Sequence, residues 1–464
     1  MWGPHGKECP GNFWPPLLLP RFVTRCAVTV TSRHGSTHTH TRDTHTLTFN
    51  LQTLQTTQNM RTQASRKQQE QDPIPPLAAL DKKDFPSISE LRKAIPEHCF
   101  RRSNARSLAL VGRDGAIIFA LAYFAWFYLP TTPDAPGATA TATGTLAWLL
   151  SWNAYWFVQG CAMTGWWVLA HECGHRGFAE SSILCDVVGY ILHSFLLVPY
   201  FSWQYSHGKH HAKTSHLSDG ETHIASIQKD SARDRWLHAV LGEDAFAIVQ
   251  MVVMLTIGWP VYLCTGITGA RRDPKKRKLK AGTLRDHFRP SSALFPTSGA
   301  WDKRILASNV GLLMTVCGLC FVGVRTNQPL KVFMLYFPAY LWVNFWLVLY
   351  TWLHHVSTQV PQLGDDEWTW IRGALCTIDR PYPFLIDWMH HHIGSTHVAH
   401  HLFSNIPCYH AVEATVALKQ YLSPKGLYNY DDRSILQAMW STAHECHYVE
   451  SENGVQMWRK WRSK

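Results

Sequence analysis

A long apolar segment that ends in two histidines runs from residue 145 to residue 175 and reads TLAWLLSWNAYWFVQGCAMTGWWVLAHECGH. Residues 145–169 contain no Asp, Glu, Lys or Arg, and a helix that spans a bilayer needs about 20 mostly apolar residues. The run ends in His171 and His175, which are four positions apart and therefore share one helix face. The sequence thus predicts a membrane helix that carries two imidazoles to the membrane surface.

Four further apolar runs lie at 116–129, 246–268, 305–324 and 331–353. The mean hydropathy of the 464-residue chain, -0.14, conceals them because residues 1–105 are mostly polar. The 12 cysteines are scattered, several of them inside apolar runs, so we expect reduced thiols and no disulfide framework. This segregation excludes a collagenous, wholly disordered or small disulfide-bonded chain and indicates an integral membrane protein.

Basic residues orient these runs. Arginines cluster at 101–113 before the first run, and the most basic segment of the chain follows 246–268, at 271–280. Positive residues favour the cytosolic face, so the run 246–268 is expected to be interfacial or re-entrant, and the interrupted segment 183–202 is expected in the interface. The prediction is an all-α integral membrane protein with about four transmembrane helices, interfacial helices and a cytosolic helical cap that carries a di-metal histidine site.

The chain divides into three parts. Residues 1–83 are polar and lack apolar periodicity, which predicts a disordered arm, and Met60 within it is a candidate start of translation. A capping box at Ser87–Glu90 marks the start of order, so a membrane domain is expected over 84–450. Residues 451–464 are expected to form a basic cytosolic tail that resembles an endoplasmic-reticulum retrieval signal.

Histidines carry the candidate chemistry, and three groups have helical ligand spacing, which is expected to place the histidines of each group on a single helix face. Neutral imidazole suits iron, zinc and copper, and eight imidazoles exceed what one ion can bind, so two metals are expected. The groups are His171-Glu-Cys-Gly-His175, His207-Gly-Lys-His210-His211 and His397-Val-Ala-His400-His401.

Two other classes of protein compete for these motifs. The first group also matches the H-E-x-x-H pattern of zinc metalloproteases, with Glu172 as general base. A protease needs only one further ligand, however, and would leave the other two groups unexplained. A membrane metal carrier would distribute its ligands along a transmembrane path, whereas these groups are predicted on one side.

These groups and their settings resemble the membrane-bound fatty acid desaturases, most closely the acyl-lipid Δ12 (oleate) and ω-3 types. The resemblance covers roughly residues 84–450 and is specific, because it includes long stretches around the histidines. The stretches are HSFLLVPYFSWQYSHGKHH at 193–211, GDDEWTWIRGALCTIDRPY at 364–382 and HHIGSTHVAHHLFSNIPCYHAVEAT at 391–415.

The resemblance implies a di-iron centre that uses O2 to remove two hydrogens from a fatty acyl lipid. It implies that electrons come from NADH through a separate cytochrome b5 and its reductase, and that the protein binds membrane lipids but no nucleic acid. The expected location is the endoplasmic-reticulum membrane, with a plastid membrane as the alternative. The implied catalytic residues are the eight histidines of the three groups, and His355 after the last apolar run is implied as a ninth metal ligand.

The resemblance also leaves choices open. H-V-A-H-H-L-F-S looks Δ12-like, whereas H-H-x-I-G looks ω-3-like, so we expect Δ12 action with ω-3 or bifunctional action as the alternative. The family scaffold also supports hydroxylases and conjugases. Arg176 stands where relatives often carry another histidine, and the basic loop 271–289 is expected to attract lipid headgroups or an acidic donor. Apolar residues flanking the histidines are candidates for an acyl channel, namely Trp166, Trp167, Phe195, Phe201, Trp203 and Phe403.

Overall fold

The structure is a computed structural model, and it describes residues 77–133, 141–280, 282–296 and 299–461, which belong to one compact unit. Met60 and the arm up to residue 76 lie outside the described residues. Order begins earlier than residue 84, because Leu77 is buried and the 3₁₀ turns η2 (Leu77–Ala79) and η3 (Lys82–Asp84) lead into helix α2 (Ile88–Ala94). The capping box predicted at Ser87 is present at the start of α2.

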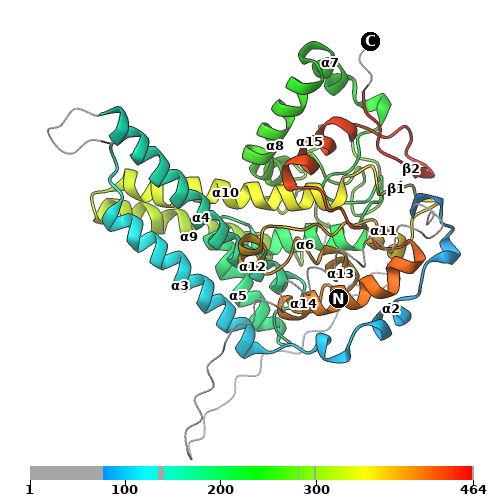
Figure 1. Cartoon of the computed structure of the whole chain (residues 1–464), viewed down its shortest axis with the longest axis horizontal. Coiled ribbons are helices and arrows are strands. Elements are labelled where there is room, and N and C mark those ends of the chain that lie inside the picture. The colour runs from blue at the N-terminus through cyan, green and yellow to red at the C-terminus, as the bar shows by residue number, and fades with distance from the viewer. Residues whose placement is uncertain (1–76, 134–140, 281, 297–298, 462–464) are drawn as a thin grey trace, which may run out of the picture. The chain divides into compact units, whose positions relative to one another are not determined.

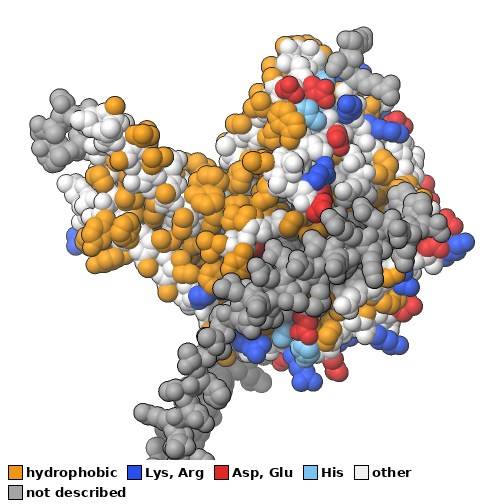
Figure 2. Space-filling view, in the orientation of Figure 1, with side chains coloured by type: hydrophobic (Ala, Val, Ile, Leu, Met, Phe, Trp, Pro, Cys, Tyr) orange, Lys and Arg blue, Asp and Glu red, His pale blue; other side chains and the backbone are white. Residues whose placement is uncertain are grey.

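Four long helices extend together from the rest of the described chain (Figure 1). They are α3 (Asn104–Tyr128), α4 (Ala142–Gly174), α9 (Asp302–Arg325) and α10 (Pro329–His355). Helix α4 packs along α3 and α10, and α10 also packs on α9. Figure 2 shows their outer surface covered by apolar side chains with few charges. Such a large exposed apolar surface suits contact with lipid.

The α3–α4 and α9–α10 turns lie at the same end of these helices. The indole N–H groups of Trp148 and Trp152 both donate to the carbonyl of Pro130, at 2.9 Å. The ammonium of Lys331, at the start of α10, donates to the carbonyl of Leu129 at the end of α3. The four helices therefore alternate in direction, and the ammonium of Lys331 beside the α9–α10 turn has a carbonyl as its hydrogen-bond partner.

By length and composition, four described helices could cross a membrane: α3, α8 (Glu243–Thr265), α9 and α10. The predicted number is confirmed, but α8 stands in this set in place of α4. Helix α4 has 33 residues, and its Trp, Asn, Gln and Thr side chains lower its mean hydropathy. Helix α8 is tied to the cap at both ends, because Glu243 pairs with Lys460 at 3.9 Å and the carbonyl of Leu263 accepts from the N–H of His287. These contacts favour the predicted interfacial position of α8.

The segment 183–202 is not a straight span. It forms α5 (Ser182–Phe195) and the start of α6 (Tyr200–Ala212), which are bent by 106° at the break between them. Pro199 stands at the N-cap of α6, where its lack of an N–H costs no helical hydrogen bond. The bend brings α6 against the end of α4, where the amide of Gln204 donates to the carbonyl of Gly174.

A cap of short elements covers one end of the long helices. Strand β2 (Val455–Gln456) pairs antiparallel with β1 (Gln362–Leu363), and Trp458 and Trp461 are buried. Residues 451–461 are thus packed on the cap, because their aromatic side chains find apolar cover. The remaining elements are η4 (Glu97–Phe100), η5 (Gln228–Asp230), α7 (Ala232–Leu241), α11 (Trp370–Leu375), α12 (Phe384–Met389), α13 (His397–Leu402), α14 (Cys408–Leu422), η6 (Ser423–Lys425) and α15 (Ile435–Glu445).

The basic loop after α8 is largely neutralised from within the cap. Arg272 pairs with Asp365 at 2.6 Å, and Lys276 pairs with Asp219 at 2.5 Å. These pairs join the loop to the segments after α6 and α10. Acidic side chains of the protein therefore neutralise part of the positive charge of the loop. The ten cysteines in the described ranges are free, as predicted.

Close packing of α4 on α10 depends on Gly160. A Cβ at this position would lie 2.3 Å from the Cβ of Trp342 and 2.9 Å from the carbonyl of Ala339. We expect Gly160→Ala to destabilise the protein by about 1–3 kcal/mol through overpacking, measured as a lower melting temperature in detergent. Gly318→Ala on α9 is the matched control, because its added Cβ meets nothing within 4 Å. Equal melting temperatures for the two variants would contradict the described helix contact.

Candidate metal centre

The nine histidines singled out in the sequence lie together at the capped end of the long helices. They come from the last turn of α4, the last two turns of α6, the end of α10 and the short helix α13. The bend before α6 and the hydrogen-bonded loop between α10 and α13 bring these four helix ends to one place. They are His171, His175, His207, His210, His211, His355, His397, His400 and His401.

Five of the nine form the first group. One ring nitrogen of each lies within 4.8 Å of one ring nitrogen of every other member. The Nε2 atoms of His171 and His175 are 3.2 Å apart, and those of His211 and His400 are also 3.2 Å apart. His207 completes the group from the first position of the α6 motif.

The other four form the second group. His210, His355 and His401 have ligand nitrogens within 4.8 Å of one another. The Nε2 atom of His355 lies 3.1 Å from that of His210 and 3.0 Å from that of His397. The rings of His211 and His401 stack at 4.1 Å between centroids and so join the two groups.

Each H-x-x-H-H motif divides between the two groups, which differs from the single convergent face expected from the sequence. Residues turn by about 100° per position in a helix, so adjacent histidines cannot point at one centre. On α6, His207 and His211 join the first group and His210 joins the second. On α13, the division is reversed, with His400 in the first group and its neighbours His397 and His401 in the second.

The electrostatics suit metal ligands. Burial holds the pKa of His397, His400 and His401 well below the ordinary value, so these imidazoles are neutral and keep a lone pair. The Nε2 atoms of His207 and His401 are buried and have no hydrogen-bond partner among the described residues. Buried imidazole nitrogens without partners are costly, and convergence on a shared cation explains both groups. The residues therefore fit two metal ions bound by an all-imidazole donor set.

Neighbouring groups fix the orientation of the histidines. The Nδ1 of His210 lies 2.8 Å from the carbonyl of Glu221, and the Nδ1 of His401 lies 3.1 Å from the hydroxyl of Thr214. An N–H donated to the carbonyl leaves the Nε2 of His210 free as a ligand. Two of the aromatic residues expected to flank the site pack on it: Trp167 stacks on His171, and Trp203 stacks on His207.

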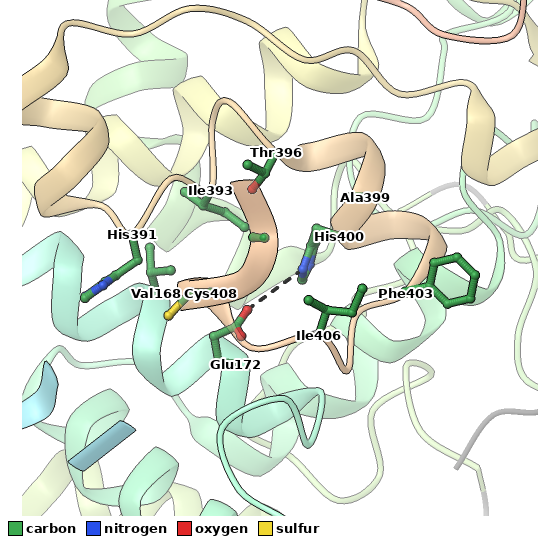
Figure 3. Close-up of a pocket in the computed structure, with 11 residues that line it drawn as sticks. Val168, Glu172, His391, Ile393, Thr396, Ala399, His400, Phe403, Ile406 and Cys408 are labelled. Carbon is green, nitrogen blue, oxygen red and sulfur yellow. Dashed lines mark ion pairs between the residues drawn. The ribbon is translucent and has the colours of Figure 1, made fainter. Parts of the chain in front are cut away.

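A pocket adjoins the first group (Figure 3). His400 and Glu172 lie on its wall, with the Nδ1 of His400 3.9 Å from the carboxylate of Glu172. Its other lining is mainly apolar and includes Val168, Ile393 and Phe403. Phe403 thus lies where a channel residue was expected, whereas the ring of Phe201 stacks on Tyr190.

Sequence reasoning did not single out His193. It is fully buried between Trp167 and Trp203, with ring centroids 5.5 and 4.6 Å away, and within the described part of the chain neither ring nitrogen has a hydrogen-bond partner. The only signal for His193 in the sequence is its place within the interrupted apolar segment 183–202, which was expected to lie in the interface. By contrast, His354 has other partners, because its Nδ1 meets the carbonyl of Ile378 and its Nε2 lies 3.2 Å from the hydroxyl of Tyr382.

A buried ion pair stabilises the segment whose carbonyl orients His210. The carboxylate of Glu221 lies 2.7 Å from Arg285 and 3.5 Å from Lys209, all largely buried. Burial alone would raise the pKa of Glu221, but these two cations hold it at about 2. Its contribution to stability is therefore present above the ordinary value of 4.5 and is lost as the pH falls toward 2.

We expect Glu221→Gln to cost about 3–5 kcal/mol, because it leaves Arg285 buried without a counter-charge. It should also lower bound metal, because the side-chain ion pair with Arg285 holds in place the backbone segment whose carbonyl orients His210. Melting temperature and metal content in detergent measure both effects. Asp365→Asn, at an acid whose side chain is 55% exposed, is the control and should cost about 1 kcal/mol or less. Equal losses in both variants would refute the supporting role.

Comparisons with known proteins agree with this site. The sequence pattern of the family described as "Fatty acid desaturase" matches residues 146–432, which include all nine histidines. An omega-6 fatty acid desaturase, endoplasmic reticulum isozyme 2, of Glycine max is 38% identical over 393 residues, which are 85% of this chain and 94% of that protein. A Delta(12) fatty acid desaturase of Calendula officinalis is 40% identical over 80% of this chain and 89% of its own. A Delta(12) fatty acid desaturase of Mortierella isabellina is 37% identical over 81% and 90%. The predicted resemblance is confirmed: this chain belongs to the fatty acid desaturase family.

Proposed function

We propose that this enzyme is an acyl-lipid Δ12 desaturase that converts oleoyl chains to linoleoyl chains at a di-iron centre. The observation that carries the proposal is the convergence of nine neutral histidines into two groups where membrane helices end. The named Δ12 and omega-6 activities of the relatives support the regiochemistry. A metalloprotease needs a single metal bound by about three residues, and a carrier needs a path of ligands across the membrane, so neither accounts for two compact groups.

In this proposal the first group of five histidines binds one iron ion and the second group of four binds the other. When bound, iron at such a dry, imidazole-rich site supplies the O2-dependent oxidation that a saturated carbon chain requires. The reaction balances when one CH2–CH2 unit, O2, two electrons and two protons give a cis CH=CH unit and two molecules of water.

The protein's own residues prepare this site. Glu221 and Thr214 hold His210 and His401 in fixed orientations through their Nδ1 atoms. Trp167 and Trp203 cover the rings of His171 and His207 and exclude water from them. Because the rings are set before any ligand binds, little reorganisation is needed at the centre.

The acyl chain is supplied by the bilayer. The exposed apolar surface of α3, α4, α9 and α10 places the histidines beside the lipid that contains the substrate. Val168, Ile393 and Phe403 give the region next to His400 an apolar lining, and we propose that the acyl chain approaches the centre along it.

Electrons are proposed to come from NADH through cytochrome b5 and its reductase. The purified enzyme, assayed with NADH and the reductase, is expected to need added cytochrome b5 for turnover, because the sequence contains no H-P-G-G haem-binding motif. Desaturation rates with and without cytochrome b5 test this step. Equal rates would contradict it.

The proposed location is the endoplasmic-reticulum membrane, which the name of the Glycine max relative gives for that protein. A fluorescent fusion viewed beside endoplasmic-reticulum and plastid markers in plant cells tests the location. Signal confined to plastids would contradict it.

Expression in yeast, which makes oleate but little linoleate, tests the reaction. The wild-type chain should produce an 18:2 acid with double bonds at Δ9 and Δ12, identified by gas chromatography and mass spectrometry. His400→Ala should reduce this product below detection, because it removes a first-group imidazole. His444→Ala is the control, since His444 pairs with Asp244 away from the nine histidines.

Other products would point elsewhere. An 18:3 acid formed only from added linoleate would replace Δ12 with ω-3 action, and a hydroxylated product would replace desaturation. Full activity of His400→Ala would contradict the proposed role of the histidine groups.

A further inference from the structure

A second cluster of metal-binding side chains lies outside the nine histidines. It combines His98 and Cys99 of η4 with His410 and Glu413 of α14, and one donor atom from each lies within 4.8 Å of the others. The two segments are more than 300 positions apart in sequence, so the cluster exists only in the folded chain. None of the four belongs to the implied iron ligands, and the proposed reaction does not use them.

The contacts in this cluster are close. The Nε2 of His98 lies 2.9 Å from the carboxylate of Glu413 and 3.8 Å from the sulfur of Cys99. The Nδ1 of His410 lies 4.0 Å from the same carboxylate, and its ring meets that of His98 edge to face at 5.4 Å. Small side-chain adjustments would place all four donors around a single ion.

One side of the cluster is exposed to solvent, and the other side is buried among apolar side chains. Cys99 is fully buried, whereas the side chains of His98 and Glu413 are about half exposed, at 51% and 49%. An ion can therefore enter from solvent and reach a thiol held in the apolar cluster beneath. That apolar cluster includes Leu91 and Leu418, which fix the position of the cysteine.

The charges around Glu413 favour a cation. Its ion-pair partners are the two histidines, and within the described ranges no Lys or Arg nitrogen lies within 4.0 Å of its carboxylate. The nearby Arg92 and Arg106 instead lie over the rings of Phe100 and Tyr409. Once a bound cation displaces the proton of the Cys99 thiol, the thiolate and the carboxylate carry two negative charges, which a divalent cation neutralises.

A third group of possible ligands, His216, Asp219 and Asp365, differs on this point. Lys276 and Arg272 already neutralise its two carboxylates. This third group therefore needs no metal ion to neutralise its carboxylates.

We propose that His98, Cys99, His410 and Glu413 form a structural Zn2+ site. Two imidazoles, one thiolate and one carboxylate are ligand types that zinc binds in tetrahedral sites, and four protein ligands leave no open position for catalysis. The donor set differs from the all-imidazole centre by its sulfur and its carboxylate.

The zinc site fastens the segment that enters α3 to the helix that borders the pocket. Beside it, the backbone N–H of Ser103, the N-cap of α3, donates to the hydroxyl of Tyr409 at 2.6 Å. Helix α14 also contributes Cys408 and Ala411 to the pocket next to His400. The ion thus holds the start of a membrane helix and one wall of the pocket in a fixed relation.

Cobalt substitution tests this site in the full-length protein in detergent. Co2+ bound by a thiolate gives an intense near-ultraviolet charge-transfer band, which the all-imidazole centre cannot give. We expect a band that saturates at about one Co2+ per chain and disappears when Zn2+ is added. Cys99→Ser should abolish the band, and Cys317→Ser, at an exposed cysteine of α9 outside the cluster, should leave it unchanged.

Glu413→Gln keeps the proposal testable if loss of the buried thiol impairs folding. This half-exposed side chain is replaced by one of equal size, and we expect Zn2+ to bind at least about tenfold more weakly, with the iron content unchanged. The proposal is overturned if wild-type protein gives no thiolate band, if the band survives in Cys99→Ser, or if Glu413→Gln binds Zn2+ as tightly as the wild type.

Discussion

The structure depends on keeping nine imidazoles neutral and convergent where membrane helices end. Each imidazole must lose most of its water, and an unpartnered buried nitrogen is tolerable only if another group or an ion takes its lone pair. Four helices must therefore end at one place with fixed rotations. The bend of 106° between α5 and α6 serves this requirement, because it directs the α6 histidines toward the end of α4.

The cap supplies the polar partners that this arrangement requires. Glu221 orients His210 through its carbonyl, and its carboxylate neutralises the buried Arg285. Asp379 has a similar role at α13, where it accepts from the N–H of Val398 and the hydroxyl of Tyr428. Burial raises the pKa of Asp379 to about 7, and these hydrogen bonds favour its charged form. A polar shell of this kind places ligand nitrogens without exposing them to water.

The sequence predicted the class of fold and the place of the chemistry because both depend on local patterns. The run 145–169 followed by His171 and His175 predicts a long apolar helix with ligands at its end, and the capping box at Ser87 depends on four adjacent residues. What the sequence could not predict depends on contacts between distant segments. The division of each H-x-x-H-H motif between two groups requires the positions of all four helices. The burial of Trp461 depends on the cap that covers it, and the neutralisation of Arg272 depends on Asp365.

Mössbauer spectroscopy of the purified protein loaded with 57Fe tests whether the histidines bind iron in separate groups of five and four. Because the two groups differ in the number of imidazoles, we expect two iron ions per chain with two distinct quadrupole doublets of equal area. A His171→Ala variant should lose one doublet first. A single iron per chain, or full iron loading after the loss of histidines from both groups, would contradict the account.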